Sequence, residues 1–134
     1  MKFKKTTKIT DIEKPELRTR EAIALFNQQL FKEALLKFEE PWKDTWGQEE
    51  RFLRGLIQVA GAFHHFNENR LESALALYHS SFDLLSNYFP VYQNIKVQKL
   101  VMNMRGAFAE LIEKGTRSGV KLNKEWIPEI QIIK

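Results

Sequence analysis

The sequence predicts an all-α fold, a five-helix bundle of two tetratricopeptide-like helical hairpins plus a long fifth helix and an extended C-terminal tail. Three observations favour this class. Apolar residues recur at helical spacing through most of residues 14–115. The segment 51–66 is apolar on most of its helical circumference, as in a central helix with several neighbours. Residues 22–38 also align with residues 62–78 at an offset of 40, and repeated helical hairpins stack on one another.

The composition places the chain among ordinary globular proteins. Its 134 residues are enough for one domain with a buried core, and 43% are hydrophobic while 28% are charged. The absence of cysteine excludes disulfides and thiol chemistry. No apolar run approaches the ~20 residues of a membrane span, and the first residues lack the apolar stretch of a signal peptide. We therefore expect a cytoplasmic protein that does not bind membranes.

Charged residues are distributed unevenly along the chain, and the predicted organisation has three parts. We expect an N-terminal arm over residues 1–13, a helical domain over 14–115, and an extended tail over 116–134 that packs on the bundle. Residues 1–20 hold seven Lys and Arg against three acids, whereas residues 21–90 hold six against ten. The basic ends would attract phosphates, but no basic cluster occupies one exposed helical face. Nucleic-acid association is therefore expected to be weak at most.

The first predicted hairpin joins helices over about 15–28 and 31–42. Pro15 followed by an acid is typical of a first helical turn. The expected buried side of the first helix comprises Leu17, Ile23, Phe26 and Leu30. Pro41 cannot donate a backbone hydrogen bond, so it should end or kink the second helix.

The second predicted hairpin joins a central helix ending near residue 67 to a helix over about 70–86. Thr45 and Gln48 have the spacing of a capping box for the central helix. Asn69 and Glu72 suggest a cap for the following helix. Gly55 and Gly61 would let neighbouring helices approach the central one closely.

A long fifth helix is expected to start at Pro90 and to stop before Gly115, a residue suited to a helix C-terminus. Its predicted buried face comprises Ile95, Leu100, Val101, Met104, Phe108 and Leu111. Beyond it, Trp126 and alternating isoleucines around Pro128 indicate an extended segment laid across the bundle.

The middle of the chain carries a recognisable pattern of residues. It includes Glu33, Ala34, Glu39, Trp42, Gly55, Leu56, Ile57, Gln58, His65 and Asn69. Over about residues 20–90 the chain resembles the small all-helical prokaryotic proteins of the domain of unknown function 309 family. The resemblance implies an all-helical fold and no established activity. A His-Glu pair of that family falls on Leu35 and Leu36 here, and its turn glycine falls on Glu68. The absence of that His and Glu removes two candidates for metal or proton chemistry.

A polar cluster between the second and third helices is the candidate site. Glu39, Gln58 and His65 could meet there, with Trp42 and Asn69 beside them. A buried carboxylate next to an imidazole suits general acid–base chemistry because each shifts the pKa of the other. The alternative is a satisfied polar network that ties two helices together, and we favour that structural interpretation.

Other kinds of site are poorly supported. His64 and His65 are adjacent, so their side chains diverge by about 100° on a helix, and His79 with Asp83 offers only two ligands. We expect no metal and no cofactor. The chain also lacks a nucleophile elbow and a phosphate-binding glycine loop.

Three functions of different classes follow. The favoured hypothesis is a non-enzymatic module that binds a protein partner or associates with itself. The alternative is an enzyme or small-ligand binder that uses the Glu39, Gln58 and His65 cluster. The third is weak nucleic-acid association through the basic ends, including Lys2, Lys4, Lys5 and Lys8.

Overall fold

The fold is an all-α bundle, as predicted. A computed structural model describes residues 15–133, which contain five α-helices and two short 3-10 helices. The α-helices are α2 (Pro15–Asn27), α3 (Phe31–Trp42), α4 (Gly47–Asn67), α5 (Leu71–Leu85) and α6 (Val97–Lys114). The 3-10 helices are η1 (Ser86–Tyr88) and η2 (Lys124–Trp126). The predicted arm over residues 1–13 lies outside the described residues.

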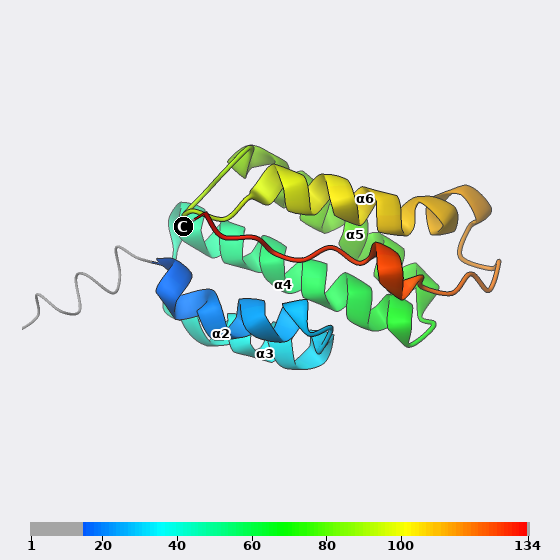
Figure 1. Cartoon of the computed structure of the whole chain (residues 1–134), viewed down its shortest axis with the longest axis horizontal. Helices are drawn as coiled ribbons and strands as arrows, with labels where there is room; N and C mark the ends of the chain where they lie inside the picture. Colours follow the sequence, from blue (N-terminus) through cyan, green and yellow to red (C-terminus); the bar gives the residue numbers. More distant parts are fainter. Residues whose placement is uncertain (1–14, 134) are drawn as a thin grey trace, which may run out of the picture.

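Helix α4 runs through the centre of the molecule. Figure 1 shows α2 and α3 on one side of α4, α5 and α6 on the other, and the chain after α6 returning along the bundle as an extended segment. Ten of the 21 residues of α4 are buried: Phe52, Leu53, Gly55, Leu56, Val59, Ala60, Gly61, Ala62, Phe63 and Phe66. The predicted central helix is thus in place.

Small residues of α4 allow the close approach of its neighbours. A Cβ added at Gly55 would lie 2.6 Å from Leu85 Cδ2 of α5. One added at Gly61 would lie 3.2 Å from Leu77 Cδ1 and 3.5 Å from Leu35 Cδ1. Helices α5 and α3 therefore both pack against α4 at Gly61.

Aromatic rings connect the first hairpin to α6 through α4. The ring of Phe63 lies 5.9 Å from Phe26 and 5.4 Å from Phe31, both of the first hairpin. On its other side the same ring lies 5.3 Å from Phe108 of α6. These side chains form one continuous core, so the two hairpins and α6 share their stabilisation by apolar burial.

The turns of the two hairpins have the same backbone. Gln29 in the first turn has φ of 65°, and Asn69, 40 positions later, has φ of 63°. The next residues also agree, with φ and ψ of −93° and 75° at Leu30 and −92° and 76° at Arg70. The 40-residue offset seen in the sequence is therefore also a repeat of backbone conformation.

Hydrogen bonding repeats at the same offset. The N–H of Leu30 donates to the carbonyl of Leu25 at 3.0 Å, and the N–H of Arg70 donates to that of His65 at 2.9 Å. This bond over five residues is the signature of the Schellman motif, which satisfies carbonyls at a helix end. The tetratricopeptide-like character of the hairpins stays a prediction.

The predicted capping box at the start of the central helix is wrong. The hydroxyl of Thr45 donates backwards to the carbonyl of Trp42 at 2.9 Å. The residue before α4 is Trp46, which makes no side-chain cap hydrogen bond. Thr45 therefore closes the end of α3, so its hydroxyl does not cap the amides of α4.

The predicted cap of α5 by Asn69 is also wrong. Asn69 has a positive φ and lies in the turn, while Arg70 takes the position before the helix without a side-chain cap. The Oδ1 atom of Asn69 accepts a hydrogen bond from Nζ of Lys121 at 3.2 Å. An asparagine in the left-handed region ends the preceding helix, as glycine often does.

The expected buried side of α2 is correct for Ile23 and Phe26, which are 4% and 0% exposed. It is wrong for Leu30, which is 39% exposed. Leu30 immediately precedes α3 and belongs to the turn, so it no longer follows the face of α2. The side chain of Leu17 lies outside the described part of the structure.

The fifth long helix starts later than predicted, at Val97 and not at Pro90. Gln93 and Asn94 have φ of 51° and 63°, values that an α-helix does not allow. They form a turn in which Tyr92 and Ile95 exchange two backbone hydrogen bonds, of 3.0 and 2.8 Å. The predicted stop is correct, since Gly115 follows the helix with φ of 89°.

The chain after α6, residues 116–133 (the C-terminal tail), is held at several places. Its residue Gln131 accepts a backbone hydrogen bond from Lys96, and Ile133 donates one to Asn94. The side chain of Asn27 pairs with the backbone of Ile130 through two hydrogen bonds, of 3.1 and 2.8 Å. Ile130 itself is buried, which places the C-terminal tail against the start of the bundle.

Candidate functional site

The three central residues of the predicted polar cluster are not bonded to one another. Within residues 15–133, no hydrogen bond or ion pair joins Glu39, Gln58 and His65. Glu39 lies half-buried on α3. The Oε1 atom of Gln58 is buried and accepts no hydrogen bond. A functional role for this cluster stays a prediction.

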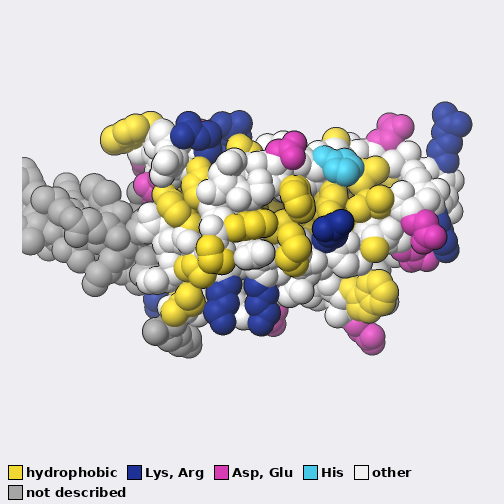
Figure 2. Space-filling view, turned by 90° about the horizontal axis from the view of Figure 1, so that it is seen from above, with side chains coloured by type: hydrophobic (Ala, Val, Ile, Leu, Met, Phe, Trp, Pro, Cys, Tyr) yellow, Lys and Arg dark blue, Asp and Glu magenta, His cyan; other side chains and the backbone are white. Residues whose placement is uncertain are grey.

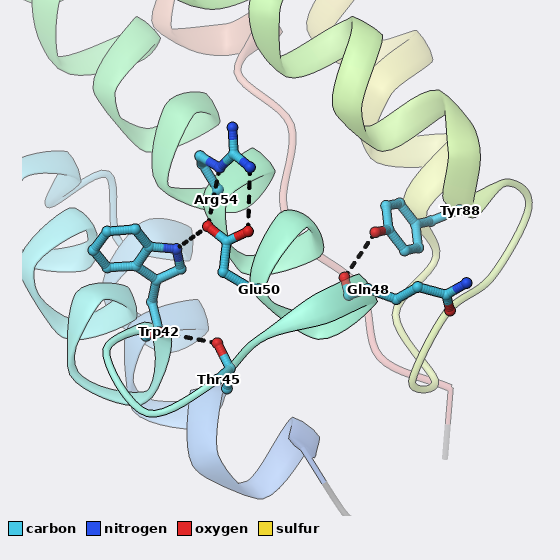
Figure 3. Close-up of polar contacts among 6 residues, drawn as sticks. All are labelled: Trp42, Thr45, Gln48, Glu50, Arg54 and Tyr88. Atoms are coloured by element: carbon cyan, nitrogen blue, oxygen red, sulfur yellow. Dashed lines mark hydrogen bonds and ion pairs between the residues drawn. The ribbon is translucent and has the colours of Figure 1, made fainter.

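Trp42 belongs to a different polar group, at the α3–α4 connection. Its indole Nε1 donates to Oε2 of Glu50 at 2.8 Å. The guanidinium of Arg54 donates to both carboxylate oxygens of Glu50, each at 3.1 Å. Figure 3 shows the Glu50 carboxylate held between the indole and the guanidinium.

These contacts explain the electrostatics of Glu50. Hydrogen bonds from Arg54 and then from Trp42 lower the pKa of its carboxyl group, although burial opposes the shift. Both carboxylate oxygens have partners, so this group closes the α3–α4 hairpin and offers no free acid or base. The sequence spacing of Glu50 and Arg54, four residues apart, indicates their pairing, but the approach of Trp42 depends on the loop before α4.

His65 lies in a cluster at the α4–α5 turn. Its Nδ1 atom accepts a hydrogen bond from Nε of Arg70 at 2.8 Å. Nη2 of the same guanidinium lies 3.3 Å from Nε2 of His64. Burial, the charge of Arg70 and His64 lower the pKa of His65. Its neutral imidazole therefore acts as an acceptor that orients Arg70.

Two neighbouring grooves lie along α6. One, of about 380 Å³, is lined by Pro90, Val91, Lys96, Gln98, Lys99 and Met102. The other, of about 450 Å³, lies between α6 and the C-terminal tail and is lined by Met102, Asn103, Gly106, Ala107, Glu125, Trp126, Ile127 and Pro128. Met102 lines both grooves, so they are adjacent.

We name the central residues of these grooves the α6 surface: Pro90, Val91, Lys96, Lys99, Met102, Gly106 and Trp126. Three of its apolar side chains are well exposed, Val91 at 42%, Met102 at 37% and Trp126 at 57%. The sequence analysis treated Trp126 as part of a packed tail and did not single out Met102. An exposed apolar position on a helix is visible in sequence only once the buried face is known.

Neither a cluster of metal ligands nor a membrane-spanning helix occurs in the described residues. In residues 15–133 no three His, Asp or Glu side chains lie close enough together to hold a metal ion. None of the helices there has the length and apolar character that a membrane crossing requires.

Comparison with known families gives one match. Residues 19–77 match the model of Domain of unknown function (DUF309). The resemblance expected from the sequence is thus confirmed over these residues. They extend from α2 into α5 and therefore include both hairpin turns, but not α6 or the C-terminal tail. No curated protein matches the chain.

Proposed function

We propose that this chain is a non-enzymatic helical module that binds a segment of another protein along the α6 surface. The observation that carries the proposal is the set of exposed apolar side chains of Val91, Met102 and Trp126, which line two adjacent grooves that share Met102. Figure 2, which looks down on the α6 side, shows apolar side chains gathered across this face with basic side chains among and beside them.

Exposed apolar area of this kind has a thermodynamic consequence. Each Å² of apolar surface removed from water contributes about 25 cal/mol before the costs of association are subtracted, and contiguous apolar patches often mark binding sites. Tryptophan, the residue type of Trp126, is among those enriched at interface hot spots. Met102 is flexible and polarisable, so it adapts to a partner's shape.

Charge indicates what the partner should carry. Lys96 and Lys99 line the groove at the start of α6, no acidic residue lines it, and the first turn of α6 contains no acid. A symmetric pairing of two copies through this patch would place the lysines of both copies in one interface, because such an interface uses the same surface on both subunits. A segment with apolar side chains and carboxylates fits better.

The polar cluster supports the non-enzymatic part of the proposal. An acid and a base that act in concert lie within hydrogen-bond reach of each other as well as of the substrate. Glu39 and His65 are not so paired, and the carboxylate of Glu50 is already bonded to Trp42 and Arg54.

The test begins with a photo-crosslinking amino acid placed at position 102 and, as a control, at exposed position 36 of α3. A protein crosslinked only from position 102 is identified, purified and titrated with the intact chain. We expect Met102→Lys and Trp126→Ala each to weaken binding about tenfold or more. The matched controls Leu36→Lys and Trp46→Ala alter residues that are 52% and 83% exposed elsewhere, and they should leave affinity unchanged.

A charge test completes the design. Lys99→Glu should weaken the same complex, and wild-type affinity should fall as salt is added. Crosslinks to the same proteins from both positions, or equal losses in the control variants, would contradict the proposal. Crosslinks between two copies of the chain alone would show that the partner is the protein itself.

A further inference from the structure

A second hollow lies at the start of α4, apart from the α6 surface. Its volume is about 420 Å³, and its lining residues are Gln48, Arg51, Leu84, Asn87, Tyr88 and Tyr92. They come from α4, the end of α5, η1 and the segment before α6. None of them belongs to the α6 surface, and the volume is in the range of small-molecule sites, about 300–1,000 Å³.

The walls of this cavity are held in place. The hydroxyl of Tyr88 donates to the backbone carbonyl of Gln48 at 2.7 Å (Figure 3). The ring centroid of Tyr88 lies 4.7 Å from that of Tyr92 and 5.2 Å from that of Phe52. A site whose walls are fixed before binding loses little conformational entropy when a ligand enters.

An amide side chain is fixed at the rim as well. Nδ2 of Asn87 donates to the carbonyls of Asp83 and Leu84, both at 3.2 Å. With its nitrogen so held, the side chain of Asn87 has one orientation at the cavity.

The charge of the cavity is positive. Arg51 is its single charged lining residue. The charge of Arg51 also reaches the cavity wall, because it opposes the rise that burial causes in the pKa of Tyr88, and the charge of Glu50 raises that pKa more weakly. The nearby carboxylate of Glu50 is bonded to Trp42 and Arg54. The cavity also adjoins the first turn of α4, where the side chain of the N-cap residue Trp46 makes no cap hydrogen bond and the helix dipole is positive.

We infer that this cavity binds a small organic anion. Its carboxylate or phosphate would pair with the guanidinium of Arg51, whose planar fork matches either group. Its apolar part, best a flat ring, would pack against Leu84 and Tyr92. This site is independent of the proposed protein-binding surface.

The test uses three small probes of similar size on the full chain: benzoate, phenyl phosphate and the uncharged benzamide. Backbone amide resonances are followed by heteronuclear NMR during titration. We expect one or both anions to shift the resonances of Gln48, Arg51, Asn87, Tyr88 and Tyr92 with a dissociation constant of about 1 mM, a value usual for fragments. Benzamide should bind at least about tenfold more weakly because it lacks the charge. Which anion binds more tightly distinguishes a carboxylate ligand from a phosphate ligand.

Variants make the assignment specific. Arg51→Met should weaken anion binding by about tenfold or more, and Arg51→Lys should give an intermediate loss because it keeps the charge without the fork. Arg51 is exposed, so the dispersion of the spectrum should stay that of a folded protein. Arg105→Met removes one exposed positive charge from α6 and should bind like wild type, as should Met102→Lys. Equal binding of benzamide, retained binding in Arg51→Met, or an equal loss in Arg105→Met would overturn the inference.

Discussion

The α2–α3 turn and the α4–α5 turn share one backbone but serve different purposes. Both end a helix with a residue of positive φ and close with the same hydrogen bond over five residues. In the first turn, the polar side chains of Asn27 and Gln29 hold the C-terminal tail. In the second, His65 and Arg70 bond to each other, and the side chains of this turn reach the tail through the exposed hydrogen bond that Asn69 accepts from Lys121.

The difference teaches which part of a turn is constrained. Helix ends must satisfy their last carbonyls, and few backbone arrangements do so. Side chains that point away from that backbone are under no such constraint. The two hairpins could therefore keep one turn geometry while their contacts diverged. Four substitutions test how far this view extends, from the largest expected effect to the smallest.

The first compares Asn27→Ala with Asn67→Ala, its counterpart 40 positions later. Asn27 makes two hydrogen bonds to the backbone of Ile130, whereas Asn67 is exposed. Asn27→Ala should reduce the free energy of unfolding by about 2–3 kcal/mol because it leaves two backbone groups without partners. Asn67→Ala should change it by less than about 0.5 kcal/mol. Urea denaturation measures both, and equal losses would show that the turns do not differ in this respect.

The second concerns glycine, since the second hairpin contains Gly55 and Gly61 while the first contains none. The new Cβ of Gly55→Ala would lie 2.6 Å from Leu85, which is fully buried. We expect a net loss of about 1–2 kcal/mol, from overpacking that exceeds the gain in helix propensity. Gly106→Ala meets nothing within 4 Å and should stabilise the protein by up to about 1 kcal/mol. Thermal unfolding of both variants tests the pair, and a stabilised Gly55→Ala would contradict close α4–α5 packing.

The third removes the unpaired carbonyl of Gln58. Gln58→Met replaces a buried oxygen without a partner by an apolar group of similar length, so the free energy of unfolding should rise by about 1 kcal/mol. Gln98→Met, at an exposed position of α6, serves as the control and should have little effect. A clear loss in Gln58→Met would mean that the amide has a partner in solution, which would revive the ligand-binding hypothesis for the predicted cluster.

The fourth substitution, His65→Leu, gives the second turn the residue type found at the corresponding position of the first turn, Leu25. The pKa of folded His65 is lowered, chiefly by burial, so the unfolded chain binds the proton more tightly. The stabilisation is complete above about pH 6.5, the usual His pKa, and is lost as the pH falls from there through the lowered value. Unfolding measured between pH 8 and 5 should show a smaller decline in His65→Leu than in wild type. The control Asn67→Ala removes an exposed side chain that does not titrate and should keep the wild-type decline, and an unchanged slope in His65→Leu would refute the assignment.

Much of the helical layout could be predicted from local pattern. The apolar stripes of α2, α3, α4 and α5 place these helices within one or two residues of their observed ends. The start of α6 could not be predicted in this way. Proline is common as a first helical residue, so Pro90 suggests a helix start, but the helix begins at Val97. The turn at Gln93 and Asn94 is closed by Tyr92 and Ile95, and Asn94 also accepts a backbone hydrogen bond from Ile133 of the C-terminal tail, a long-range contact without a local signal.

The candidate site was harder to predict for the same reason. The spacing of Glu50 and Arg54 indicates a pair, but the sequence analysis assigned Trp42 to a cluster with Glu39. The choice of partner depends on the path of residues 43–46, which no periodic pattern describes. The cavity around Arg51 depends on η1 and on the segment before α6, so it required the whole fold.

The C-terminal tail has a consequence for the order of folding. The contacts within each hairpin join residues close in sequence, whereas the bonds of Asn27 to Ile130 and of Gln29 to Lys124 span 103 and 95 positions. Closing so long a loop costs entropy before any bond rewards it, and distant contacts slow folding. We therefore expect the contacts within the hairpins to form before the C-terminal tail docks on Asn27 and Gln29.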